Sequence, residues 1–241
     1  VPHLHTDAIP LTTATALAPT SFSIALTTSP PPRPRPLSAA LTAAAALAPT
    51  PCALANDRVF AVKSNATVAR TVELEISLNF GWTWMSLNVE AVDMSVDTVL
   101  ATASPTDGDH VKSQFRFTQF YPGWGFYGTL VSFTTDSMYA VHLTNPATLR
   151  FSGTPVVLPK QIAITGPSSW TYVPCPHQTS MTLKQGMPVG VTFSLNDQFK
   201  SQFQFSSFYP GYGWFGSLNH VQPGVGYMLW VSGDAGIGTF Q

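Results

Sequence analysis

Hydrophobic and polar residues alternate along much of the chain, which is the period of a half-buried β-strand. Residues 72–80 (VELEISLNF) alternate without interruption, and residues 187–195 (MPVGVTFSL) repeat the pattern. Shorter apolar segments rich in β-branched or aromatic residues lie at 59–62, 139–143, 161–165 and 226–231. One short helix is predicted over residues 93–100, capped by Asp93 or Ser95. The predicted fold class is therefore mainly β, with immunoglobulin-like or sandwich-type strands.

The first 56 residues differ in composition from the rest, being rich in Ala, Thr and Pro around the run SPPPRPRP. Consecutive prolines predict an extended, polyproline-type N-terminal arm. Within the arm, residues 21–28 alternate so that Phe22, Ile24 and Leu26 share one face. A single strand cannot satisfy its own backbone groups, so this segment is predicted to be a donor strand that completes a sheet elsewhere.

An internal repeat dominates the remainder of the chain. At an offset of 88, residues 109–131 align with residues 197–219 without a gap, and 13 of the 23 positions are identical, which indicates two copies of one module. The predicted division is an N-terminal arm at 1–56, β-sandwich strands at 57–80, a first repeat at 81–156, and a linker strand with the second repeat at 157–241.

Each copy contains the pattern G-x-G-x-x-G, as YPGWGFYG at 121–128 and YPGYGWFG at 209–216. A dinucleotide loop needs small residues between its glycines and a helix after them. Here bulky rings such as Trp124 and Trp214 fill the motif, and no helical pattern follows. The glycines are therefore predicted to build a turn that requires positive φ.

The amino-acid composition argues against nucleic acid as a binding partner and against a membrane span. Of 241 residues, 10% are charged and the net charge is −1, so no basic field is available to hold nucleic acid. An Ala-rich segment at residues 37–48 is too short to span a bilayer, so no membrane span is predicted. A surface with few charges favours association between copies of the chain.

Candidate catalytic chemistry is sparse. The sequence contains no G-x-S-x-G or H-E-x-x-H pattern, and no nucleophile with an acid or base can be named. We therefore predict no enzyme activity, no cofactor and no metal site. Asp109 matches Asp197 in the repeat and is predicted to bond its own turn, and Phe115 and Phe117, which match Phe203 and Phe205, are predicted to form core and cross-strand packing.

Tryptophans leave two interpretations open. Exposed rings at Trp124 and Trp214 would stack against sugars, whereas rings at equivalent positions of a repeat are commonly core. Asn65 opens the N-glycosylation sequence Asn-Ala-Thr. Cys52 and Cys175 either pair as a disulfide in an oxidising compartment or remain two unpaired thiols.

Five stretches of the sequence are similar to the motifs of a known family: GWTWMSLNV (81–89), GDHVKSQ (108–114), YPGWGFYGTL (121–130), YPGYGWFGSL (209–218) and PGVGYM (223–228). Together they resemble a tandem β-module of secreted bacterial and algal surface proteins, often present in many copies and largely uncharacterised biochemically. The first copy departs from it at residues 135–139 (TDSMY), and the second at 169–176 (SWTYVPCP). The resemblance implies an extracellular or cell-surface, non-enzymatic, structural or adhesive protein.

The sequence supports two hypotheses about function. The first is a subunit of a self-assembling surface filament, in which the donor strand of one copy enters a sheet of the next and builds a helical homo-oligomer. The second is a carbohydrate-binding or adhesive module that uses the exposed aromatic residues of the repeats, with glycans as partners.

Overall fold

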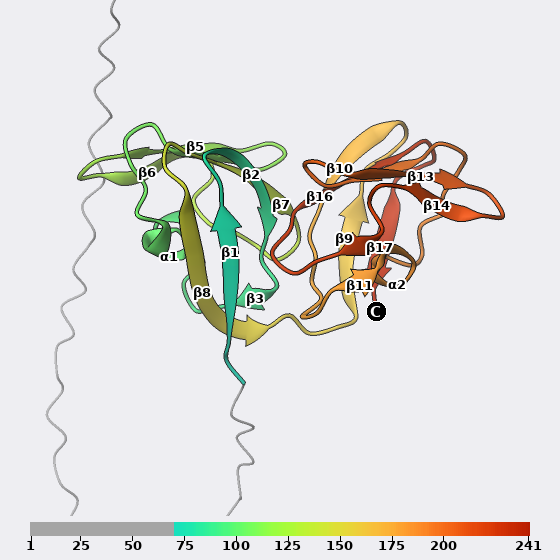
Figure 1. Cartoon of the computed structure of the whole chain (residues 1–241), viewed down its shortest axis with the longest axis horizontal. Helices are drawn as coiled ribbons and strands as arrows, with labels where there is room; N and C mark the ends of the chain where they lie inside the picture. The colour runs from blue at the N-terminus through green and yellow to red at the C-terminus, as the bar shows by residue number, and fades with distance from the viewer. Residues whose placement is uncertain (1–69) are drawn as a thin grey trace, which may run out of the picture. The chain divides into compact units, whose positions relative to one another are not determined.

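The computed structural model describes residues 70–241. Its architecture is mainly β, as the alternation predicts, and it consists of two repeats (Figure 1). The predicted donor strand with Phe22, Ile24 and Leu26, the acceptor Asn65 and the thiol of Cys52 lie outside the described residues.

The first repeat is a two-layered β-structure. One layer is a five-stranded antiparallel sheet in the order β2-β7-β4-β5-β6, and the other is a three-stranded sheet in the order β1-β8-β3. The strands are β1 (Val72–Leu78), β2 (Gly81–Ser86), β3 (Val89–Glu90), β4 (His110–Lys112), β5 (Phe117–Tyr121), β6 (Gly125–Gly128), β7 (Met138–Leu143) and β8 (Ala147–Pro155). Between β3 and β4 lie a helix α1 (Val96–Val99) and a 3-10 turn η1 (Ala101–Ala103).

The core of this repeat lies between its two layers. Leu74 and Ile76 of β1 and Leu149 of β8 face Val111 and Val141 of the five-stranded sheet, and all five are buried. Alternation in β1 places Leu74, Ile76 and Leu78 on the buried face, as the sequence predicts. Burial of this apolar face is the main force that holds the layers together.

The second repeat has the same plan. Its five-stranded sheet runs β10-β16-β12-β13-β14, and the pairs β9–β17 and β11–β15 lie beside it. The elements are β9 (Lys160–Ile164), β10 (Ser169–Val173), β11 (Met181–Thr182), α2 (Leu183–Gly186), β12 (Gln198–Lys200), β13 (Phe205–Tyr209), β14 (Gly213–Gly216), β15 (His220–Val221), β16 (Tyr227–Val231) and β17 (Gly236–Phe240).

Strand pairing moves the repeat boundaries from those predicted. β1 pairs with β8 just as β9 pairs with β17: Val72 is opposite Gly153, and Lys160, which is 88 residues after Val72, is opposite Phe240, which is 87 residues after Gly153. β1 is thus the first strand of the first repeat rather than part of a separate sandwich. Likewise β9 is the first strand of the second repeat rather than a linker.

A buried carboxylate fixes one turn in each repeat. Asp109 accepts hydrogen bonds from the backbone N–H and hydroxyl of Thr106, at 2.7 and 3.1 Å, and of Thr144, at 2.7 and 2.8 Å. Asp197 accepts from the N–H groups of Ser194 and Ser232, at 2.8 and 2.9 Å. The prediction that Asp109 bonds its own turn is confirmed, and the second repeat reproduces the arrangement.

The glycine motif forms a β-hairpin in each copy, as the sequence argument expects. Gly123 and Gly125 have φ of +78° and +79°, and Gly211 and Gly213 have +82° and +94°, conformations that side chains rarely adopt. The third glycine, Gly128 or Gly216, lies so close to the neighbouring strand that a Cβ would collide with its backbone. The motif therefore serves chain geometry rather than phosphate binding.

Two equivalent glutamines join the repeats. The side chain of Gln202 donates to the carbonyl of Trp82 at 2.8 Å and accepts from the N–H of Trp84 at 3.0 Å. The side chain of Gln114 donates to the carbonyl of Trp170 at 2.7 Å and accepts from the N–H of Tyr172 at 3.0 Å. The side-chain amide of one glutamine in each repeat thus supplies hydrogen-bond partners to the free edge of the other repeat's five-stranded sheet, at β2 or at β10.

The sequence departures between the copies lie at this same junction. The loop containing Gly224 and Gly226 approaches β2, where Ser86 N–H donates to the Gly224 carbonyl at 3.0 Å and Gly226 N–H donates to the Trp84 carbonyl at 3.1 Å. The Ser86 hydroxyl accepts from the N–H of Cys175 at 3.0 Å. The Pro-Gly loop of the second copy and its VPCP segment are therefore specialised for the contact between repeats.

Two predictions about local structure are wrong. Residues 187–195 form no strand but a loop, because Pro188 lacks a donor and Gly190 has φ of +87°. Phe115 is not a core residue, since it is 84% exposed and lies outside the strands, whereas Phe117 of β5 packs across the sheet with its ring 5.5 Å from that of His110 in β4. The helix expected over 93–100 is confirmed in shorter form, with Ser95 accepting from the Thr98 N–H. Within residues 70–241 no helix has the length and apolarity needed to cross a bilayer.

Candidate ligand-binding site in the second repeat

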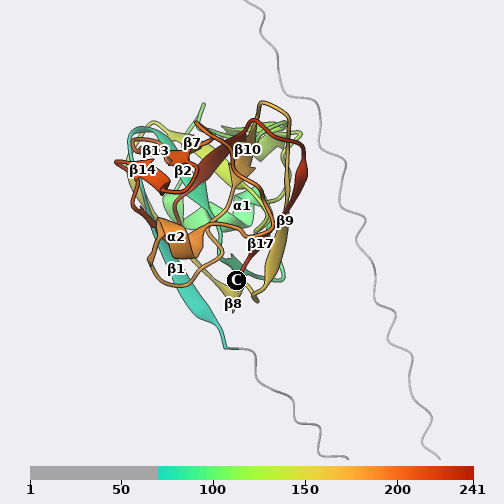
Figure 2. The ribbon, with the colours of Figure 1, turned by 90° about the vertical axis from the view of Figure 1, so that its right-hand side faces the viewer.

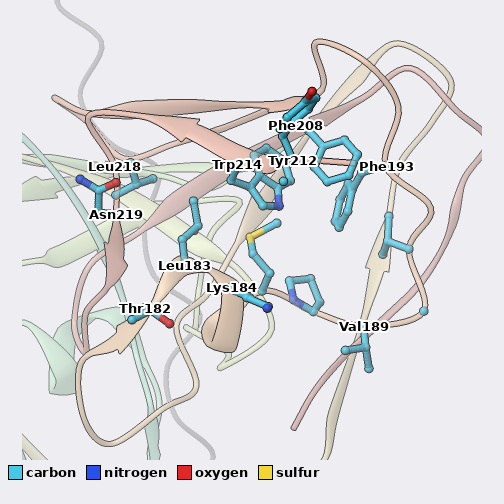
Figure 3. Close-up of a pocket in the computed structure, with 15 residues that line it drawn as sticks. Thr182, Leu183, Lys184, Val189, Phe193, Phe208, Tyr212, Trp214, Leu218 and Asn219 are labelled. Atoms are coloured by element: carbon cyan, nitrogen blue, oxygen red, sulfur yellow. The ribbon is translucent and has the colours of Figure 1, made fainter. Parts of the chain in front are cut away.

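A pocket of about 680 Å³ opens in the second repeat between α2, the loop that follows it and the hairpin β13–β14. Figure 2, in which this repeat faces the viewer, places α2 below the hairpin, and Figure 3 gives the side chains at close range. Its volume lies within the range of small-molecule sites, roughly 300–1,000 Å³. The residues that line the pocket include Thr182, Lys184, Phe193, Phe208, Tyr212, Trp214 and Asn219.

Aromatic rings form one wall of the pocket (Figure 3). The Trp214 ring meets Phe193 edge-on with centroids 5.0 Å apart, and it meets Phe208 edge-on at 5.4 Å. Phe193 and Phe208 lie 5.6 Å apart, which completes a three-ring cluster. Such packing fixes the Trp214 ring in one orientation. Tyr212 stands at the rim and is 82% exposed.

Polar groups lie toward the opposite side of the pocket (Figure 3). They are the hydroxyl of Thr182, the ammonium of Lys184 and the amide of Asn219. The Thr182 hydroxyl donates to the Gln185 side chain at 2.6 Å, so its lone pairs still accept hydrogen bonds. The site therefore combines a rigid apolar wall with donors and acceptors placed across from it.

The helices α1 and α2 occupy the same position in their repeats. The N–H of Val96 donates to the Val131 carbonyl at 3.1 Å, and the N–H of Leu183 donates to the carbonyl of Asn219, the residue equivalent to Val131, at 2.8 Å. Val96 and Leu183 are each the first helical residue. The second helical residues, Asp97 and Lys184, therefore correspond.

This pair explains why the pocket opens in the second repeat. Asp97 accepts a hydrogen bond from the N–H of Phe126 at 2.8 Å, which ties α1 to the hairpin β5–β6. The equivalent hairpin residue is Trp214, whose N–H would face Lys184. An ammonium group carries donors and no acceptor, so the tie cannot form there. The second repeat thus leaves open a groove that the first repeat bridges.

The structure separates the two tryptophans predicted to stack against sugars. Trp214 is half-buried and lines the pocket, whereas Trp124 is 42% exposed at the tip of hairpin β5–β6 in the other repeat. They are not equivalent positions, because the offset of 88 matches Trp124 with Tyr212 and Trp214 with Phe126. The two tryptophans therefore belong to no common site.

Cys175, for which the sequence leaves open a disulfide with Cys52 or a free thiol, lies in the core of the second repeat and is 1% exposed. Burial raises the pKa of its thiol to about 12, so the group stays protonated at neutral pH. No cluster of three or more His, Cys, Asp or Glu side chains in residues 70–241 is placed to hold a metal ion.

Sequence reasoning missed most of the pocket. Tyr212 could have been found, since it is the counterpart of the exposed Trp124 in an ungapped alignment. Phe193 belongs to a segment predicted to be a strand, and no local signal marks it as a wall of a pocket. Lys184 could not have been matched with Asp97, because the offset within the helices is 87 rather than 88.

Comparisons of the chain with family models, with curated proteins and with solved structures give no match.

Proposed function

We propose that this chain is a non-enzymatic extracellular or cell-surface module that binds carbohydrate in the pocket of its second repeat. The observation that carries the proposal is the fixed, half-buried ring of Trp214 in a pocket that has hydrogen-bonding groups on its other side. The apolar face of a sugar ring stacks on indole, while its hydroxyls need both donors and acceptors. The pocket offers both kinds of contact.

The lining residues favour binding over catalysis. Among them only Lys184 and Tyr212 can titrate, and neither a carboxylate nor an imidazole is present. Hydrolysis of glycosidic bonds most often uses two carboxylates that flank the scissile bond. A site of this composition is suited to hold a sugar without cleaving it.

Glycan-array screening of the full chain, followed by calorimetric titration of the best ligand, tests this proposal. Tyr212→Ala removes an exposed rim ring and is expected to weaken binding, and Trp214→Phe installs the residue that the first repeat carries at this position. The matched control is Trp124→Ala, which removes the ring that the first repeat carries at the position equivalent to Tyr212. Binding that is equally sensitive to Trp124→Ala would contradict a pocket in the second repeat.

A filament subunit is the second candidate, because within residues 70–241 one sheet edge has no partner strand. β1 is an edge strand in the order β1-β8-β3 among the described residues, and a pocket of about 430 Å³ lies along it beside Arg70. A strand from another copy, such as the predicted donor segment with Ile24, would add to that edge by backbone pairing.

Electron microscopy of the full chain beside an Ile24→Lys variant tests the filament. Fibres in the unmodified chain alone would support strand exchange through residues 21–28. Monomers in both samples would exclude it and leave the carbohydrate-binding module as the sole proposal.

A further inference from the structure

The outward face of each five-stranded sheet carries a lysine packed on a tryptophan, and exposed aromatic residues lie beside it. Trp82 and Trp170 are the same residue in equivalent positions, as are Lys112 and Lys200, and none of the four is buried. Phe115 and its counterpart Phe203 are 84% and 81% exposed. Identity at buried positions such as Asp109 follows from the fold, but identity at exposed positions needs another cause.

The tryptophans lie on the edge strands of the two sheets, where each strand contacts the other repeat. β2 contributes Trp82 and Trp84 and is bonded by Gln202 of the second repeat, and β10 contributes Trp170 and is bonded by Gln114 of the first repeat. The Lys200 ammonium lies 4.1 Å from the Trp170 ring centroid and 5.9 Å from that of Trp84, so it touches both repeats. We call the side chains of Trp82, Trp84, Lys112, Trp170, Tyr172 and Lys200 the lysine–tryptophan face.

Both lysines on this face are held in place by aromatic rings rather than by carboxylates. Lys112 lies 4.8 Å from the centroid of Trp82, in the same relation as Lys200 to Trp170. Cation–π contact orients an ammonium group without neutralising its charge. The ion pairs within residues 70–241 use Arg150 and Lys160 instead.

Cross-strand pairing defines what else the face presents. From Trp82 the row continues through His142, His110 and Gln119 to Tyr127. From Trp170 it continues through Trp230, Gln198 and Ser207 to Phe215. No residue in these rows is acidic. The face is locally cationic and aromatic, although the net charge of the chain is −1.

We propose that the lysine–tryptophan face is a second binding site, for an acidic polysaccharide that carries uronate carboxylates or sulfate esters. The rings stack on the apolar faces of sugar units, and each ammonium pairs with one anionic group. Because each repeat supplies one lysine–tryptophan pair, a polymer with regularly spaced charges engages both pairs at once. This site is distinct from the pocket beside Trp214 and stands on different residues.

Affinity electrophoresis and calorimetry of the full chain test the proposal with a polyuronate, a sulfated galactan and a neutral β-glucan. The unmodified chain is expected to bind one or both acidic polymers, less tightly as salt is raised, and to prefer them to the glucan. Bivalent attachment multiplies affinity by about a hundredfold or more. Lys112→Gln alone and Lys200→Gln alone are therefore each expected to lower affinity for the long polymer by roughly tenfold or more.

Matched controls separate this site from the pocket. Lys184→Gln removes a lysine of the pocket, and Tyr212→Ala removes its rim ring; both are expected to leave binding of acidic polymer unchanged. The proposal is overturned if the Lys112→Gln, Lys200→Gln double variant binds the acidic polymers as the unmodified chain does, or if the double substitution weakens binding of the neutral glucan by the same factor. Equal affinity for single-stranded DNA would also overturn it, since the face would then respond to any polyanion.

Discussion

Lys184 of α2 occupies the position that Asp97 holds in α1, and the exchange replaces a hydrogen-bond acceptor with a donor. Around Asp97 the helix and the hairpin are joined by a hydrogen bond from the Phe126 N–H at 2.8 Å. Around Lys184 the same elements border a pocket of about 680 Å³. We infer that this one residue of a four-residue helix governs whether the helix is tied to the hairpin.

Lys184→Asp is expected to close the pocket. The introduced carboxylate would accept from the Trp214 N–H, draw the hairpin onto α2 and add about 0.5–1.5 kcal/mol to the free energy of unfolding. Carbohydrate binding in the pocket would fall, and hydrogen exchange at the Trp214 amide would slow. Lys184→Ala is the control, since it removes the ammonium without adding an acceptor. Unchanged exchange in the aspartate variant would refute the explanation.

Gln114→Ala and Gln202→Ala are each expected to lower the free energy of unfolding by about 1–3 kcal/mol, because each leaves one backbone N–H and one carbonyl without a partner. Urea titration measures the loss, and hydrogen exchange should quicken at Tyr172 in the first variant and at Trp84 in the second. Gln119→Ala, on the outward face of the same sheet, should change stability by less than about 0.5 kcal/mol. A similar loss in all three variants would argue against a specific role for the two amides.

Asp109→Asn is expected to lower the free energy of unfolding of the first repeat by about 1.5–3 kcal/mol, because the new NH2 group meets N–H and O–H donors of Thr106 or Thr144. Burial alone would raise the pKa of Asp109, but the hydrogen bonds from Thr106 and Thr144 outweigh it and lower the pKa below 3.8. The stabilisation by the Asp109 carboxylate is therefore complete above pH 3.8, and it is lost as the pH falls through the lowered pKa of Asp109. Urea titrations from pH 2 to 7 check the sign, and the asparagine variant should lack this component.

His177 makes the stability of the fold depend on pH in a second way, because here burial rather than hydrogen bonding lowers the pKa. Burial lowers the pKa of its imidazole below 6.5, and its Nε2 lies 3.3 Å from the Gly186 carbonyl. The unfolded chain takes up a proton as pH falls below 6.5 while the folded chain does not, so stability declines on acidification from that point. His177→Gln should reduce the slope of stability between pH 7 and pH 5. An unchanged slope would show that other groups carry it.

Much of the fold follows from the sequence because local and tertiary preferences agree there. β1 alternates and its apolar face is buried, and β7, β9 and β16 coincide with the apolar segments predicted as strands. The carboxylate of Asp109 bonds the turn that the Asp-Gly sequence before it suggests. These features depend on residues close together in the chain.

What could not be predicted depends on contacts between distant segments. Residues 187–195 alternate like a strand, yet they border a pocket, because Phe193 packs on Trp214 instead of pairing across a sheet. Phe115 is a residue type that is typical of a protein core, yet it lies in a loop. Its neighbour in that loop, Gln114, bonds the other repeat. The opening beside Lys184 depends on an acceptor that only the first repeat provides.

The glutamine contacts also have a consequence for counting. Each repeat brings one amide-bearing loop and one bare strand edge, and two repeats use up both of each. Two such modules are therefore a complete set, whereas a third would be left with a loop and an edge unmatched. Chains built on this junction should favour even numbers of modules, and an odd one would have to find its mate in another molecule.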